Sequence, residues 1–175
     1  MLNNPTLNQN PIKINRSLIS VFDKTGVVKL AHTLHELGIE ILSTGGTAKA
    51  LRTANIPIIE VSDYTQFPEI MDGRVKTINP LVEAGILGLR DKHSKDAESN
   101  QIHWIDLVVC NLYPFSETIS REDCDLALAL ENVDIGGPTM IRSAAKNVGW
   151  VCAVVDPSDY STIMDELKSN GELSF

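Results

Sequence analysis

The chain has 175 residues, of which 43% are hydrophobic, 22% charged and 5% aromatic, and its formal net charge at pH 7 is −8. This balance is typical of a single soluble domain with a hydrophobic core and excludes an intrinsically disordered chain. The acidic charge excludes a broad nucleic-acid surface, because such surfaces neutralise phosphates with clustered lysine and arginine.

The apolar runs and the cysteines indicate the cellular setting. Apolar runs such as 107–110 and 151–155 are strand-sized, far short of the ~20 residues that cross a membrane. The N-terminal stretch lacks the apolar core of a secretory signal. Cys110, Cys124 and Cys152 lack the paired spacings of disulfide frameworks and zinc sites. We therefore expect a cytoplasmic protein with reduced thiols, with no metal site and no membrane or nucleic-acid partner.

Residues 1–15 are rich in Asn and Pro without periodicity, which predicts a loose N-terminal arm before one folded domain over 16–175. The first half of that domain alternates short apolar runs with helical spacing. The predicted elements, in chain order, are a strand over 17–22, a helix over 27–37 ended by Gly38, a strand over 39–42, a helix over 47–54 and a strand over 58–61.

The second half begins less regularly. Asn79 and Pro80 predict a helix start, because Asn is a good N-cap and Pro is favoured at the first helical position. Residues 92–100 are charged and should be exposed. The remaining predicted elements are a strand over 105–111, a helix face at Leu126, Leu130 and Val133, a helix starting at Gly137 and carrying Arg142 and Lys146, a strand over 151–155, and an amphipathic helix through Tyr160, Ile163, Met164 and Leu167.

This alternation predicts an α/β fold. Strands that are almost wholly apolar are typical of a mostly parallel sheet covered by helices on both faces, which gives three layers. The carboxyl ends of parallel strands emerge at one edge of the sheet, where ligands of open α/β folds usually bind.

A glycine pair lies where the second predicted strand turns into a helix. Gly45 and Gly46 let successive backbone N–H groups point outward, and the helix N-terminus adds positive potential, so the turn is a candidate anion site. The hydroxyls of Ser43 and Thr47, and Lys24 from the turn after the first strand, are candidate partners of the anion. A plain structural turn beside a solvated lysine would have the same sequence.

Further candidate groups lie later in the chain. Arg74 and Lys76 are two residues apart, so in an extended segment they project to one side and favour a bound anion. Asn111 and Tyr113 repeat this spacing at a strand end, and Asp134 precedes a helix. Each also has a structural interpretation as a solvated charge, a buried tyrosine or a helix cap.

Taken together, six stretches of the sequence resemble a known family. They are VFDKTG (21–26), STGGTA (43–48), DGRVKT (72–77), NLYPF (111–115), DIGGPT (134–139) and AAKN (144–147). In this order they resemble the inosine monophosphate (IMP) cyclohydrolase domain of the bifunctional AICAR transformylase/IMP cyclohydrolase of purine biosynthesis. The similarity covers about residues 16 to 175 and implies a methylglyoxal-synthase-like fold.

The resemblance also implies a reaction and a set of site residues. The reaction converts 5-formamidoimidazole-4-carboxamide ribotide into IMP with loss of water, and it needs no metal or redox cofactor. The implied catalytic residues are Lys76 beside the carboxamide, with Tyr113, Asp134 and Lys146 around the formyl oxygen, Asp134 keeping Lys146 charged. The implied substrate-binding residues are Lys24, Ser43, Gly45, Gly46, Thr47, Arg74, Thr77, Asn111 and Gly136.

Four positions depart from the family pattern. Phe22 stands where Ser is usual and removes a hydroxyl near the expected phosphate site. Asn79 and Glu83 each replace a His, and Leu81 replaces a Lys or a small residue. These changes are expected to alter substrate affinity, while the fold and the implied catalytic residues are retained.

The family also implies partners outside this chain. A transformylase domain, which uses 10-formyltetrahydrofolate, follows the cyclohydrolase domain in the family and is absent from these 175 residues. The full-length proteins of the family are homodimers, so a homodimer is expected here.

Two other functions are compatible with the predicted fold. Methylglyoxal synthase would need a carboxylate base near the phosphate site, for which Asp23 is the candidate. An allosteric domain, like the one that ends large carbamoyl phosphate synthetases, would bind a nucleotide without turnover.

Overall fold

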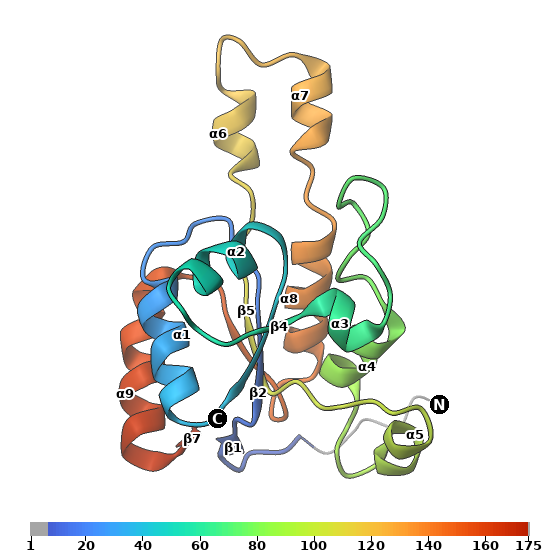
Figure 1. The fold of residues 1–175 in the computed structure, drawn as a ribbon, viewed down its shortest axis with the longest axis vertical. Coiled ribbons are helices and arrows are strands. Elements are labelled where there is room, and N and C mark those ends of the chain that lie inside the picture. Colours follow the sequence, from blue (N-terminus) through green and yellow to red (C-terminus); the bar gives the residue numbers. More distant parts are fainter. Residues whose placement is uncertain (1–6, 175) are drawn as a thin grey trace.

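The computed structural model describes residues 7–174 (Figure 1). Its strands are β1 (Ile12–Lys13), β2 (Arg16–Ile19), β3 (Glu40–Ser43), β4 (Ile59–Glu60), β5 (Leu107–Val109), β6 (Cys152–Val154) and β7 (Glu172–Leu173). Its helices are α1 (Val27–Glu36), α2 (Gly45–Thr53), α3 (Val61–Thr65), α4 (Pro80–Leu87), α5 (Ser94–Ser99), α6 (Phe115–Ile119), α7 (Leu126–Glu131), α8 (Gly136–Lys146) and α9 (Tyr160–Asn170), with a 3-10 turn η1 (Pro157–Asp159). Within this part of the chain, no helix has the length and apolar character needed to cross a membrane.

The main sheet has five strands in the order β4-β3-β2-β5-β6, and every neighbouring pair is parallel. With helices on both faces, this confirms the predicted three-layer α/β fold. The chain steps outward from β2 to β4 on one side, then returns to place β5 and β6 on the other. The order therefore reverses between β2 and β5, and such a reversal opens a crevice at the carboxyl ends of the two strands.

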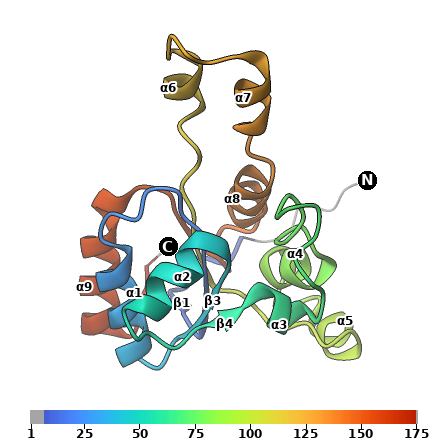
Figure 2. The same ribbon diagram turned by 45° about the horizontal axis from the view of Figure 1, so that its top comes forward.

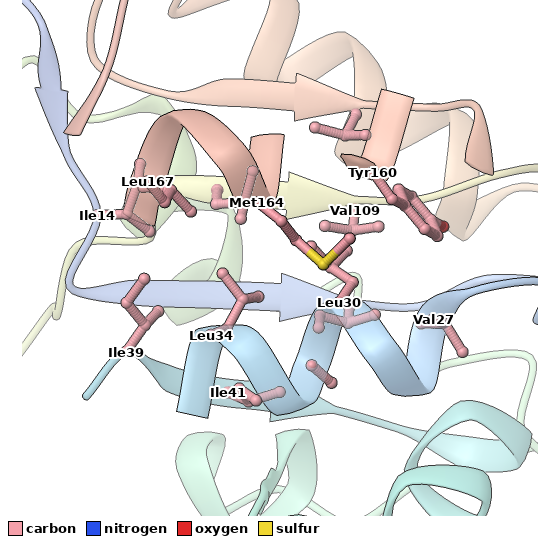
Figure 3. Close-up of a cluster of buried hydrophobic side chains, with 14 of the residues drawn as sticks. Ile14, Val27, Leu30, Leu34, Ile39, Ile41, Val109, Tyr160, Met164 and Leu167 are labelled. Atoms are coloured by element: carbon pink, nitrogen blue, oxygen red, sulfur yellow. The ribbon is translucent and has the colours of Figure 1, made fainter. Parts of the chain in front are cut away.

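Alternating side chains of the strands divide the core between the two faces of the sheet. Leu107 and Val109 of β5 join one buried cluster, while Val108 between them joins the other. Figure 3 shows the first cluster, in which Leu30 of α1 and Met164 of α9 pack on the same face. Helices α4 and α8 cover the opposite face. The sheet is thus buried on both sides, which explains its apolar strands.

The predicted helix ends are confirmed at two places. Gly38 follows α1 with a φ of +75°, a conformation that glycine adopts without strain. Asn79 caps α4, because its side chain accepts a hydrogen bond from the backbone N–H of Leu81.

Several predicted strands are shorter in the structure. The first ends at Ile19 instead of residue 22, because both backbone polar groups of Val21 bond to the Thr47 hydroxyl and not to a neighbouring strand. The third keeps only Ile59–Glu60, since Val61 begins helix α3, which the sequence did not predict.

The predicted N-terminal arm over residues 1–15 is wrong for its last residues. Ile12 and Ile14 are buried in the core, and β1 pairs antiparallel with β7 at the end of the chain. These two isoleucines belong to the fold because apolar side chains there cover the edge of the first cluster. Residues 1–6 of the predicted arm lie outside the described residues.

Helices α6 and α7 form an arm over residues 115–131 that projects from the body in both views (Figures 1 and 2). The helix predicted from Leu126, Leu130 and Val133 is present as α7, but it ends at Glu131, so Val133 lies beyond it. Leu126 is 75% exposed and Leu130 is 62% exposed, and no residue of α7 is buried. The apolar side chains recur at helical spacing as predicted. Their exposed fractions show that, within the described residues, most of this helix face is uncovered.

Candidate functional site

A cavity of about 370 Å³ lies where the strand order reverses, at the carboxyl ends of β2 and β5. This volume is within the range of small-molecule sites. Ten of the thirteen predicted site residues line it, namely Lys24, Gly46, Thr47, Arg74, Lys76, Thr77, Asn111, Tyr113, Asp134 and Gly136. Ser43, Gly45 and Lys146 do not line it.

The glycine turn at the start of α2 forms one wall of the cavity. Gly45 has a φ of +56°, which favours glycine, and this conformation starts the helix directly after β3. The first backbone N–H groups of any helix have no partner within the helix. Among residues 7–174, the amides of Gly45, Gly46 and Thr47 form no hydrogen bond and α2 has no side-chain cap. The turn therefore offers free donors and a helix N-terminus to an anion.

Two lysine amines flank this turn. A methyl group added at Gly45 would lie 3.4 Å from Lys76 Nζ, and one added at Gly46 would lie 3.7 Å from Lys24 Nζ. Lys24 Nζ also donates to the carbonyl of Phe22, and within the described residues neither lysine has a carboxylate partner. Two unneutralised positive charges beside free amides favour a bound dianion such as a phosphate.

Filling the turn should weaken anion binding. In Gly46→Leu, we expect inorganic phosphate to bind at least about tenfold more weakly, because a side chain occupies the space of two charge-assisted hydrogen bonds. Isothermal titration calorimetry measures this affinity. Gly46→Ala is the matched control, since its methyl group would be in ordinary contact with Lys24. Equal affinity in Gly46→Leu and wild type would place the anion elsewhere.

The hydroxyls near the turn serve the fold. Ser43 is fully buried and its Oγ donates to the carbonyl of Ile19 at 2.8 Å. Thr47 lines the cavity, but its hydroxyl donates to the Val21 carbonyl and accepts from the Val21 amide, both at 3.0 Å. They therefore hold the turn against β2, so neither of these two hydroxyls is free to donate to an anion.

Arg74 and Lys76 line the same cavity but point toward different neighbours. An isolated bridge between Ile70 and Val75 folds this segment back on itself. Lys76 then reaches the glycine turn, whereas the Arg74 guanidinium pairs with the carboxylate of Glu131 on α7. The two cations thus reach opposite parts of the cavity, which the spacing in an extended segment did not predict.

Glu131 competes with any anionic ligand for Arg74. We expect Glu131→Gln to tighten binding of a phosphorylated ligand by up to about fivefold, because exposed ion pairs contribute at most about 1 kcal/mol. Calorimetry at low salt measures the change. Glu122→Gln is the control, as it removes an exposed charge from the same arm. Unchanged affinity in Glu131→Gln would show that Arg74 does not contact the ligand.

Asn111 positions the loop that follows β2. Its Oδ1 accepts from the amides of Phe22 at 2.7 Å and Asp23 at 2.8 Å, and its Nδ2 donates to the Asp23 carbonyl at 3.0 Å. These three bonds occupy most of the amide's hydrogen-bonding capacity. Asn111 therefore fixes the shape of the cavity wall more than it offers contacts to a ribose or base.

Asp134 and Lys146 lie at opposite ends of α8. The Oδ1 of Asp134 accepts from the Gly137 amide at 2.9 Å, just before the helix, and Thr77 packs against Gly136. Lys146 is exposed at the last position of this 11-residue helix, which rises about 16 Å. The expected pairing of these two charges is therefore wrong for this structure.

Cys110 and Asp23 are both poorly placed or poorly suited to act on a ligand in the cavity. Burial, and secondarily the charge of Asp134, raise the pKa of Cys110 to about 12, so its thiol is protonated and a poor nucleophile at neutral pH. Asp23 does not line the cavity, and hydrogen bonds from Thr25 lower the pKa of its carboxyl. Within the described residues, no cluster of His, Cys, Asp or Glu has the arrangement of a metal site.

The sequence did not single out several residues of the cavity. In the sequence, Phe22 stands out only because it lacks the usual Ser hydroxyl, yet its ring lines the wall beside Tyr113. Glu131, Val133 and Ile135 line the cavity from the base of the arm. Val133 and Ile135 could have been singled out because they directly flank Asp134 in the chain, whereas Glu131 lies three positions before it.

The comparisons with known proteins agree with this fold. The chain matches the model of the MGS-like domain over residues 26–139, from α1 to the start of α8. It is similar to a solved structure described as the crystal structure of ForH, with 34% sequence identity and a TM-score of 0.81, and the match covers 89% of this chain and 79% of that chain. The matched region includes the glycine turn, Lys76, Tyr113 and Asp134. The chain belongs to the MGS-like domain family.

Proposed function

We propose that this protein is an IMP cyclohydrolase, which closes the second ring of the purine from 5-formamidoimidazole-4-carboxamide ribotide. The observation that carries the proposal is that one cavity gathers residues from five of the six stretches that resemble that family. The MGS-like domain also occurs in PurH, the bifunctional enzyme that these stretches resemble, and in related enzymes.

The free amides of the glycine turn and Lys24 are the natural site for the 5′-phosphate of the ribotide. Phosphate is a dianion with several acceptor oxygens, and it matches donors at a helix N-terminus and an unpaired ammonium group. With the phosphate at that end, the ribose and base extend toward the Tyr113 and Asp134 side of the cavity.

Ring closure is intramolecular. The carboxamide nitrogen attacks the formyl carbon and a C–N bond forms. The C–O bond then breaks, a C=N bond forms to the formamide nitrogen, and the oxygen leaves as water with one proton from each of the two nitrogens. Holding the two groups in an attacking pose can supply about 7 to 11 kcal/mol. No cofactor is needed, because both reacting groups belong to one substrate.

The remaining work is proton transfer and charge stabilisation. An amide nitrogen is a poor nucleophile, so a cation near it, such as Lys76, favours its loss of a proton. The Tyr113 hydroxyl can donate to the developing formyl oxygen, and the Asp134 carboxylate can accept a proton. Lys146 has no role in this proposal, because it lies at the far end of α8.

The test is to incubate the purified protein with the formylated ribotide and follow the absorbance of IMP, with product identity checked by mass. Turnover supports the proposal, and binding without turnover would favour a ligand-binding domain. Dihydroxyacetone phosphate, the substrate of methylglyoxal synthase, should give no product. That rival needs a carboxylate near the phosphate site, and its candidate, Asp23, lies outside the cavity lining.

A further inference from the structure

Two aromatic rings lie side by side on the wall of the cavity. The centroids of Phe22 and Tyr113 are 5.0 Å apart, and the ring planes are tilted by 54°. Both residues line the cavity, Phe22 with 47% and Tyr113 with 48% of its surface exposed. A pair that served only to fasten one loop to another would gain most by being covered, yet about half of each residue remains open.

The backbone around these rings is held in place. Asn111 accepts from the Phe22 amide, and the Lys24 amine donates to the Phe22 carbonyl. Tyr113 follows Asn111 by two residues, so the same side chain links both ring-bearing loops. Because β2 and β5 are paired neighbours in the sheet, the two loops start from adjacent strand ends. The rings are therefore preorganised before any ligand arrives.

The rings lie close to the glycine turn. Val21, directly before Phe22, is bonded through both its backbone groups to the hydroxyl of Thr47 in the first turn of α2. Lys24, which contacts the Phe22 carbonyl, also lies beside Gly46. One cavity thus combines an anion site with an aromatic surface, and a ligand with a phosphate and a planar ring can use both.

We propose that Phe22, together with Tyr113, forms a stacking surface for the planar heterocycle of a phosphorylated ligand, and that Phe22 sets the preference for ring-bearing phosphates over sugar phosphates. Aromatic side chains stack with heterocycles through their π faces. The choice of a ribotide as ligand rests on the proposed function. Ser is usual at position 22 in the family that this sequence resembles, so this surface is a property of this chain.

The test compares two ligands that differ only in the heterocycle. Isothermal titration calorimetry with IMP and with ribose 5-phosphate should show that the wild-type protein binds IMP more tightly. In Phe22→Ala, which removes the ring without adding a hydroxyl near the phosphate site, IMP affinity should fall by about tenfold or more, while ribose 5-phosphate affinity should change by less than about twofold. Phe22→Tyr should retain IMP affinity, since it keeps a ring. Phe67→Ala is the matched control, because Phe67 is 48% exposed and lies outside the cavity lining.

Three results would overturn the inference. They are an unchanged IMP affinity in Phe22→Ala, an equal loss for both ligands in a variant that melts like wild type, or a wild-type protein that binds ribose 5-phosphate as tightly as IMP. Turnover of the formylated ribotide separates this inference from the proposed function. An active enzyme whose IMP affinity ignores Phe22 contradicts only the inference, and a protein that stacks IMP on Phe22 without turnover contradicts only the cyclohydrolase proposal.

Discussion

Lys76→Ala should lower the kcat for ring closure by about 10²- to 10³-fold, the loss typical when one group that stabilises transition-state charge is removed. Lys76 has no carboxylate partner among the described residues, and its amine reaches into the cavity near Gly45. Its charge is thus available to the substrate. Steady-state kinetics with the formylated ribotide measure kcat and KM separately.

The position of Lys76 beside the glycine turn makes the separation of kcat from KM informative. A lysine that only held the phosphate would, when removed, raise KM and leave kcat near the wild-type value. That outcome would contradict the catalytic role and assign Lys76 to the phosphate site. Lys49→Ala is the control, because Lys49 is an exposed cation on the same helix as the turn and does not line the cavity. It should leave both constants unchanged.

The layered fold was predictable because strands buried on both faces have an unmistakable composition. The run from Leu107 to Val109 is wholly apolar, and its successive side chains alternate between the two buried clusters. The arm of α6 and α7 was not predictable. Spacing at Leu126 and Leu130 has the same period whether a helix face is buried or exposed, and only the three-dimensional arrangement decides what covers it.

The position of the site was predictable from topology, whereas the partners of its side chains were not. Residues after parallel strands meet at one edge, so the glycine turn and Lys24 were expected to come together. Sequence spacing does not show that the Ser43 hydroxyl is taken by the Ile19 carbonyl, or that Glu131 pairs with Arg74. Those outcomes depend on contacts between residues far apart in the chain.

One pair of substitutions can separate the structural role of Asp134 from the catalytic role that we propose for it. Its Oδ1 accepts from the Gly137 amide at the start of α8, which is a structural role. Asp134 also lines the cavity, where the proposed mechanism has its carboxylate accept a proton. Asp134→Asn retains an oxygen acceptor for the Gly137 amide but removes the base. Asp134→Ala removes both.

We expect both variants to lose about 10²- to 10⁴-fold in kcat, the usual contribution of a general base. Only Asp134→Ala should also unfold more easily, by about 0.5 to 2 kcal/mol, because it alone loses the cap. Thermal or denaturant unfolding measures the second effect. The matched control is Asp125→Asn, in which the same change affects a residue that caps α7 through the Leu128 amide, outside the cavity lining.

The pattern across the three variants decides the role of the carboxylate. If Asp134→Asn keeps wild-type turnover and only Asp134→Ala loses activity in step with its stability, then Asp134 is a helix cap and the base must be another group. If Asp134→Asn loses turnover while it melts like wild type, the loss follows the charge and not the fold. Since the amide and the carboxylate have nearly the same shape, packing differences cannot produce the second result.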